Sequence, residues 1–307
     1  MPDHHHHHDH HHDHAPTGEY DRAFAVGTVL NLGFVAAGVG FGLAANSMAL
    51  LADAAHNLSD VLGLLLGWGA AWLARRPPTR HRTYGWGRGS IFAVLLNATI
   101  LLIAIGGIGV EAVHRLVTPQ PVSDLIVMVV AAVGIIINGA TALMFMRGRG
   151  DDLNIRAQFI HMAGDAGVSA GVVVAGLLMR LTGWTWLDPL SSLAIAVVIL
   201  IGTWGLLRES LDLAMDAVPP GVSQNEVEAW LAALPGVHEV HDLHIWGLST
   251  TETALTAHLV CADDGAQQRL PDLSSQLQER FGIGHSTLQI ETNADAELCR
   301  LRPQHVV

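Results

Sequence analysis

The sequence predicts a membrane protein with an all-α bundle of six transmembrane helices, followed by a small cytosolic α+β domain. Half of the 307 residues are hydrophobic and only 14% are charged, whereas soluble domains carry about a quarter charged residues. The polarity is also uneven, because long apolar runs fill residues 23–207 and the rest of the C-terminal part resembles a soluble domain. We therefore expect a His-rich tail, a transmembrane domain, a linker and a cytosolic domain at residues 1–20, 21–208, 209–222 and 223–307.

Six segments are long and apolar enough to cross a bilayer, which takes about 20 residues of helix. They are residues 23–45, 48–73, 90–114, 123–146, 155–180 and 186–207. Glycine and other small residues are frequent in all six, as expected where transmembrane helices pack closely. Trp184 and Trp186 lie in a short connection, where aromatic side chains favour the membrane interface.

The placement of arginine predicts the orientation of these helices. Arg115 and Arg180 are the basic residues on one side of the membrane, whereas the loops after the second and fourth helices and the end of the sixth are rich in arginine. The arginines of this second set are Arg75, Arg76, Arg80, Arg82, Arg88, Arg147, Arg149, Arg156 and Arg208. The positive-inside rule makes these loops cytoplasmic. Both termini and the soluble domain are then cytoplasmic, in a cell (inner) membrane.

The N-terminal run "MPDHHHHHDHHHDHAP" allows two interpretations. Expression tags are usually an unbroken run of histidine, whereas aspartate interrupts this one. We favour a native tail that gathers metal, because His-rich tracts bind metal ions. The run lacks the pattern of a signal peptide.

The C-terminal part has the periodicities of a two-layer α+β domain. "NEVEAWLAAL" has helical spacing, "HEVHDLHIWGL" and "TETALTAHLVC" are typical of strands, residues 266–281 form an amphipathic pattern, and "HSTLQIET" predicts a third strand. The order α-β-β-α-β favours a reduced ferredoxin-like fold. Residues 209–307 carry fifteen Asp and Glu against four Arg, a charge of −11. That field either attracts cytosolic cations or only keeps the domain soluble.

Two identical pairs of ionisable residues interrupt the apolar segments. His56 and Asp60 lie in the second segment, and His161 and Asp165 in the fifth. Residues four apart share one face of a helix, and ionisable residues inside a membrane are costly and usually functional. If the two helices pack face to face, two imidazoles and two carboxylates form a ligand set that suits tetrahedral Zn²⁺. The alternative is a pair of buried hydrogen bonds that stabilise the bundle.

Asp53 lies one turn before His56 on the same side of the predicted helix. Its carboxylate either orients the imidazole of His56 by a hydrogen bond without itself binding the metal, or it is an aspartate at a helix end near the interface.

At this point the sequence resembles the cation diffusion facilitator family over nearly its whole length. The similar stretches are "NSMALLADAAHNLSD", "HRTYGWGR", "LNIRAQFIHMAGDAGVS", "WLDPLSSLAIAVVIL", "HDLHIWGL" and "HSTLQIE". The resemblance implies a homodimeric antiporter of divalent cations and protons, embedded in membrane lipid, whose cytosolic domain dimerises. It places the transport site at His56, Asp60, His161 and Asp165, and the paired His-Asp form resembles the zinc-transporting branch.

The chemistry of these ligands suits an exchange of metal for protons. Zinc needs neutral histidine and ionised aspartate, so its binding competes with protons, and the unperturbed pKa of histidine is about 6.5. We expect cytoplasmic Zn²⁺ to be exported by alternating access. Imidazole and carboxylate also accept Co²⁺ or Cd²⁺, and we expect no nucleic-acid partner.

Strand alternation predicts a second metal site on one polar face of the sheet. His244, His258, His285 and Glu291 would share this face. His241 matches a ligand position of the family, which conflicts with strict alternation unless it lies at a strand end. The alternative is a solvated face with scattered histidines. The two cysteines, Cys261 and Cys299, are expected to be a packed thiol and a tail thiol, respectively.

Two other functions remain as alternatives to transport. A membrane metalloenzyme would usually keep an open zinc position with three protein ligands, and the sequence has no HExxH motif. A metal sensor or scaffold would bind zinc in the membrane without moving it.

Overall fold

The computed structural model describes residues 17–146, 153–261 and 270–302. The chain divides into two compact units, one made of residues 1–61 and 108–195 and the other of residues 62–107 and 196–307. We describe the two units separately. The His-rich tail lies largely outside the described residues, and its interpretation stays a prediction.

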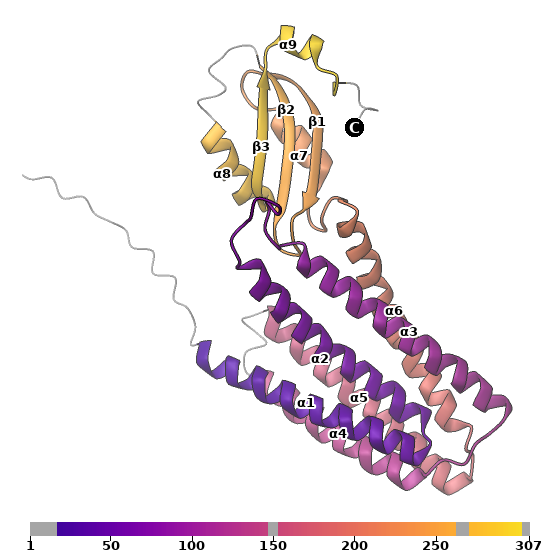
Figure 1. Ribbon diagram of the computed structural model, residues 1–307. Helices are drawn as coiled ribbons and strands as arrows, with labels where there is room; N and C mark the ends of the chain where they lie inside the picture. Colours follow the sequence, from indigo (N-terminus) through magenta and orange to yellow (C-terminus); the bar gives the residue numbers. More distant parts are fainter. Residues whose placement is uncertain (1–16, 147–152, 262–269, 303–307) are drawn as a thin grey trace, which may run out of the picture. The chain divides into compact units, whose positions relative to one another are not determined.

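Six long helices form the membrane part of the chain, in agreement with the predicted fold class (Figure 1). They are α1 (Thr17–Ala45), α2 (Met48–Ala74), α3 (Gly89–Val117), α4 (Asp124–Phe145), α5 (Leu153–Thr182) and α6 (Leu187–Ala214). In the described part of the chain, α2 to α6 contain spans that are long and apolar enough to cross a membrane, and α1 contributes the shorter apolar stretch Asn31–Ala45. α6 continues to Ala214, seven residues beyond the apolar run, because a helix need not end where its apolar sequence ends.

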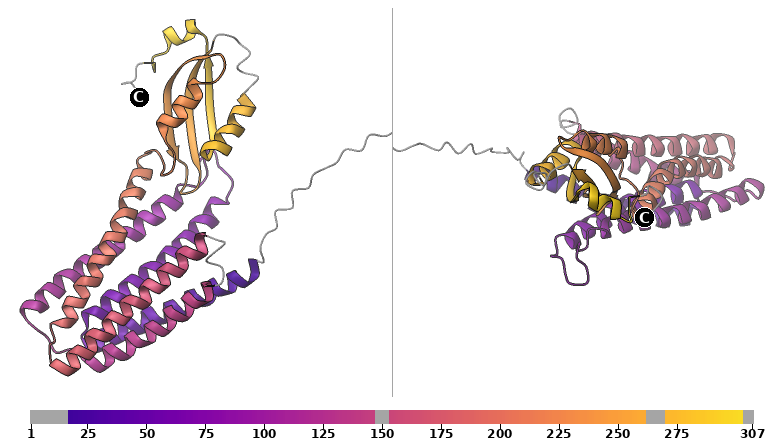
Figure 2. Two further views of the ribbon diagram at one scale, coloured as in Figure 1. Left: turned by 180° about the vertical axis from the view of Figure 1, so that it is seen from behind. Right: turned by 90° about the horizontal axis from the view of Figure 1, so that it is seen from above.

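In the first unit, α4 packs along α5, and α1 packs along α4 (Figures 1 and 2). The helices approach closely at Gly134 of α4. A Cβ atom there would lie 2.7 Å from Cζ of Phe34 and 2.9 Å from Oγ of Ser169. The absence of a side chain at this position therefore allows the backbone of α4 to lie against both neighbours, as small residues do in membrane bundles.

The second unit contains a three-stranded sheet with the predicted element order. Its elements are α7 (Gln224–Ala232), β1 (Val237–Gly247), β2 (Thr253–Cys261), α8 (Leu270–Phe281), β3 (Ile283–Glu291) and α9 (Asn293–Leu298). The strand order is β1-β2-β3, with β1 antiparallel and β3 parallel to β2. The short helix α9 was not predicted. It begins at a capping box formed by Thr292 and Asp295.

One face of this sheet carries the core, and α7 and α8 cover it (Figure 2). The buried side chains of the core are Val227, Leu231, Ile245, Leu255, Ala257, Leu259, Cys261, Leu277 and Ile283. Cys261 is buried there, so the expectation of a packed thiol at this position is confirmed. The opposite face is left for polar side chains.

The end of the α2–α3 loop and the start of α3 contact other segments of the same unit. The backbone N–H of Thr250 donates to Oγ of Ser90 at 3.0 Å. Arg88 forms an ion pair with Asp216, which follows α6. These contacts attach the β1–β2 turn and the end of α6 to the start of α3.

Candidate metal centres and family membership

The two predicted His-Asp pairs lie against each other in the first unit. Nε2 of His56 is 3.1 Å from Oδ1 of Asp165 and 3.9 Å from Oδ2 of Asp60. Nε2 of His161 is 3.4 Å from Oδ2 of Asp60 and 3.7 Å from Oδ2 of Asp165. Each imidazole therefore faces both carboxylates, as expected when the i and i+4 faces of α2 and α5 pack together.

This transmembrane cluster has the chemistry of a divalent-cation site. His56, His161 and Asp165 each offer a ligand atom, and these atoms lie within 4.8 Å of one another. Asp165 is only 4% exposed, and its Oδ2 accepts no hydrogen bond in the described structure. A cation would balance the buried carboxylate of Asp165 and satisfy the free Oδ2 atoms of Asp60 and Asp165. Two imidazoles and two carboxylates match the preferred ligand number of Zn²⁺.

Asp53 lies one helical turn before His56 and is also buried, at 3% exposure. Its Oδ1 and Nδ1 of His56 are both buried without a hydrogen-bond partner among the described residues. A metal-bound histidine usually donates its second ring N–H to a carboxylate or carbonyl. The structure therefore leaves both atoms of such a contact free, and the role of Asp53 stays a prediction.

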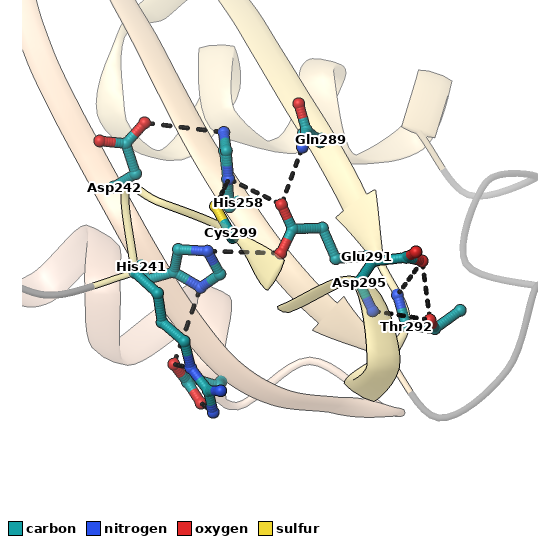
Figure 3. A network of polar contacts seen from close by, with 10 residues as sticks. His241, Asp242, His258, Gln289, Glu291, Thr292, Asp295 and Cys299 are labelled. Carbon is teal, nitrogen blue, oxygen red and sulfur yellow. Dashed lines mark hydrogen bonds and ion pairs between the residues drawn. The ribbon is translucent and has the colours of Figure 1, made fainter. Parts of the chain in front are cut away.

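A second cluster lies on the polar face of the sheet, where β1, β2 and β3 each contribute one ligand-type side chain (Figure 3). Nδ1 of His258 is 2.9 Å from Oε1 of Glu291, and Nε2 of His241 is 3.4 Å from Oε2 of Glu291. His241 and Glu291 are 7% and 4% exposed. Nε2 of His241 and Oε2 of Glu291 have no hydrogen-bond partner among the described residues. These free buried atoms fit a bound metal ion.

A β-bulge explains why His241 belongs to this cluster. The register between β1 and β2 shifts between His241 and His244, and Asp242 adopts a φ of 50°. The extra residue breaks strict alternation, so His241 pairs directly with His258. The predicted conflict between His241 and alternation is thus removed by a bulge in the strand and not by a strand end.

The other two predicted ligands lie outside the cluster. His244 has Nε2 2.9 Å from Oδ1 of Asp242, whose Oδ2 is 3.6 Å from Nε2 of His258. Among the described contacts, His244 is thus connected to the cluster through that carboxylate alone. His285 lies at the start of β3, opposite Ala254, and its ring contacts Tyr84 at 5.4 Å between centroids. The expectation that His285 shares the site is therefore not supported by the contacts in the structure.

Cys299 joins the cluster instead of forming a free tail thiol. Its Sγ is 3.6 Å from Nδ1 of His258, and it completes a group of four ligand-type residues with His241, His258 and Glu291. The helix α9 carries the chain back over the sheet after β3. The sequence signal was only that Cys299 follows Glu291 closely, and no motif spacing indicated it.

Arg302 anchors the segment that carries Cys299. Its Nε and Nη2 donate to the two carboxylate oxygens of Glu239 at 2.9 and 2.7 Å. This bidentate hydrogen bond from the guanidinium lowers the pKa of the Glu239 carboxyl below its ordinary value. The C-terminal segment is thereby attached to β1 two residues before His241.

Comparison with known proteins gives matches over both parts of the chain. Residues 24–213 match the cation efflux transmembrane domain, and residues 219–293 match the cytoplasmic domain of cation efflux proteins. The chain belongs to the cation diffusion facilitator family.

Relatives within the cation diffusion facilitator family cover most of the chain. The cation efflux system protein CzcD of Alcaligenes sp. is 36% identical over 91% of this chain and 89% of its own length. The zinc transporter ZitB of Escherichia coli is 31% identical over 91% of this chain and 90% of its own length. The cadmium, cobalt and zinc/H(+)-K(+) antiporter of Bacillus subtilis is 30% identical over 84% of this chain and 86% of its own length.

A solved structure, the metal-bound C-terminal domain of the CzcD transporter from Cupriavidus metallidurans, is 42% identical over 23% of this chain and 99% of that chain, with a TM-score of 0.21.

Membership of the cation diffusion facilitator family determines the general function. The family comprises metal transporters and not enzymes, so the metalloenzyme hypothesis is excluded. The chain is a multi-pass membrane protein for efflux of metal cations, as its apolar helices and its relatives indicate.

Proposed function

We propose that the chain exports Zn²⁺ in exchange for protons, and that the transmembrane cluster is the transport site. The observation that carries this proposal is that each of His56 and His161 faces both Asp60 and Asp165 at 3.1–3.9 Å, across two apolar helices. The names of the relatives, which include a zinc transporter and a zinc/H(+)-K(+) antiporter, support the choice of ions.

The four ligands provide the coupling between metal and protons. Zn²⁺ binds neutral imidazole and ionised carboxylate, so protonation of the same groups weakens metal binding. An ion that enters from the cytoplasm displaces protons, and protons that arrive from the other side displace the ion. Alternating access of the two sides to one midplane site then gives antiport. The ligand set also accepts Co²⁺ and Cd²⁺, which we expect as weaker substrates.

We further propose that the second cluster, on the polar face of the sheet and here called the cytosolic cluster, holds a resident metal ion, which we expect to be zinc. We also propose that the C-terminal domain that carries it forms a homodimer. The ligands would be His241, His258 and Glu291, with the thiol of Cys299 beside them. The match to the cytoplasmic domain of cation efflux proteins supports dimerisation. The arginine distribution supports a cytoplasmic location of both termini, in a cell (inner) membrane.

Transport by reconstituted protein tests the main proposal. Proteoliposomes that contain a zinc-sensitive dye are exposed to zinc under an imposed pH gradient. We expect flux in the wild type that follows the gradient, and loss of this flux, by at least about tenfold, in a variant with His161→Ala and Asp165→Ala. The matched control removes one histidine and one aspartate elsewhere in the membrane part, His114→Ala with Asp124→Ala, and should keep its flux.

Other outcomes would change the assignment. Flux that is unaffected by His161→Ala with Asp165→Ala would place the transport site elsewhere. Zinc binding without flux in the wild type would support the sensor hypothesis. Zinc flux that does not depend on the pH gradient would contradict exchange for protons, but it would remain consistent with metal efflux.

A further inference from the structure

The loop between α2 and α3 carries four arginines whose charges are not balanced within the structure. Arg75, Arg76, Arg80 and Arg82 are all exposed. Residues 75–90 contain no Asp or Glu, and none of the four guanidiniums forms an ion pair with another residue that the structure describes. Arg88 of the same loop differs, because it is paired with Asp216. The four free charges stand out in a chain with a net charge of −12.

Tryptophan side chains lie beside two of these arginines. The guanidinium of Arg76 stacks on Trp72 at 4.2 Å from the ring centroid, and that of Arg82 stacks on Trp86 at 3.8 Å. Trp72 is 51% exposed at the end of α2. Stacking orients a planar guanidinium while its N–H groups remain free to donate. The combination of an exposed indole and a fixed cation is typical of the membrane–water interface.

The fold keeps this loop close to the bilayer surface. The loop joins the end of α2 at Ala74 to the start of α3 at Gly89, and both helices are long and apolar enough to span a membrane. Thr79 and Arg82 exchange two backbone hydrogen bonds, at 3.0 and 3.1 Å. The tip is therefore a folded turn, and the arginines lie within a short distance of the helix ends.

We propose that Arg75, Arg76, Arg80 and Arg82 form a docking surface for the phosphate groups of anionic phospholipids. Arginine binds phosphate through parallel N–H···O contacts, and clusters of four or more basic residues next to a membrane helix attract anionic headgroups. The acidic cytosolic domain of a second copy is the other available anion. We favour the lipid because two of the four guanidiniums are stacked on tryptophans. One of these, Trp72, lies in the last turn of α2, where the helix leaves the membrane.

Spin-labelled lipids test this docking surface in the full chain. The protein is reconstituted in phosphatidylcholine vesicles that contain traces of spin-labelled phosphatidylglycerol or spin-labelled phosphatidylcholine. The fraction of motionally restricted label gives the preference for the anionic lipid. We expect the wild type to prefer phosphatidylglycerol by at least about fivefold, which is the factor that one arginine near an anionic surface supplies. Salt should weaken this preference.

Three variants are compared with the wild type in the same lipid measurement. Replacing all four arginines with glutamine should bring the preference close to one, while replacing all four with lysine should retain most of it because the charge remains. Changing two exposed arginines of the cytosolic domain, Arg280→Gln with Arg300→Gln, should have no effect. Thermal unfolding in detergent verifies that each variant folds.

Two results would overturn the proposal. One is a wild type without any preference for phosphatidylglycerol, and the other is a glutamine variant that keeps the preference of the wild type. If that variant also no longer dimerises, the four arginines belong to a contact between subunits.

Discussion

Asp188, at the start of α6, caps the N-terminus of α2. Its Oδ2 accepts a hydrogen bond from the backbone N–H of Met48 at 2.7 Å, and the hydroxyl of Ser47 donates to its Oδ1. Asp188 and Ser47 are fully buried. A carboxylate satisfies the free N–H groups of a helix N-terminus and is stabilised by the helix dipole. The helix that begins at this cap carries Asp53, His56 and Asp60.

Replacing Asp188 should therefore destabilise the membrane part of the protein. We expect Asp188→Ala to lower the free energy of unfolding by about 1–2 kcal/mol, as loss of an N-cap does, and Asp188→Asn to cost less because one acceptor oxygen remains. Thermal unfolding in detergent measures the change. Asp124→Asn, in the first turn of α4 but more exposed, is the matched control and should be close to neutral. Equal stability of Asp188→Ala and wild type would contradict the cap.

The substitution Asp53→Asn tests whether this carboxylate acts in metal binding or only in the packing of the bundle. If its carboxylate orients His56, Asp53→Asn should lower the zinc affinity of the transmembrane site by about tenfold or more. Titration of zinc into the purified protein measures this affinity, with the cytosolic cluster removed by His241→Ala in both proteins. The control is Asn57→Ala, because Asn57 is buried on the same helix but donates to the backbone carbonyl of Asp53 at 2.9 Å. An unchanged affinity in Asp53→Asn would assign Asp53 to the bundle alone.

Cys299 should be visible as a ligand when cobalt replaces zinc. A thiolate bound to Co²⁺ gives a charge-transfer absorption that histidine and carboxylate ligands lack. We expect this band in the wild type, its loss in Cys299→Ala and its retention in Cys261→Ala, since Cys261 lies in the core on the other face of the sheet. Arg302→Gln should weaken the band, because it detaches the C-terminal segment from Glu239. A band that persists in Cys299→Ala would exclude the thiol from the site.

Gly134 should be intolerant of even a methyl group. A Cβ atom would meet Phe34 at 2.7 Å and Ser169 at 2.9 Å, so Gly134→Ala forces the side chains of α1 and α5 away from α4. Overpacking of this kind costs about 1–3 kcal/mol. Gly139→Ala in the same helix meets nothing within 4 Å and should be neutral or stabilising by up to about 1 kcal/mol. Thermal unfolding of the two variants compares them directly, and equal melting temperatures would show that the contact relaxes at no cost.

The sequence by itself determined every long helix and strand of this protein, except the short helix α9, and the two His-Asp pairs of the transmembrane cluster. A transmembrane helix must satisfy its own backbone, so long apolar runs are sufficient to predict helices α2 to α6. Spacing of four residues along a helix is equally local, and it placed His56 with Asp60 and His161 with Asp165 on common faces. The order of helices and strands in the cytosolic domain also followed from periodicity within each segment.

Only the tertiary structure decided which distant residues meet. The bulge at Asp242 depends on the pairing of β1 with β2, and it moved His241 onto the face of His258 and Glu291. Cys299 reaches this cluster because α9 turns back over the sheet, and Asp188 reaches α2 because two helices far apart in sequence begin side by side. Local periodicity contains no information on these contacts, because their free energy depends on packing between segments that the sequence pattern treats as independent.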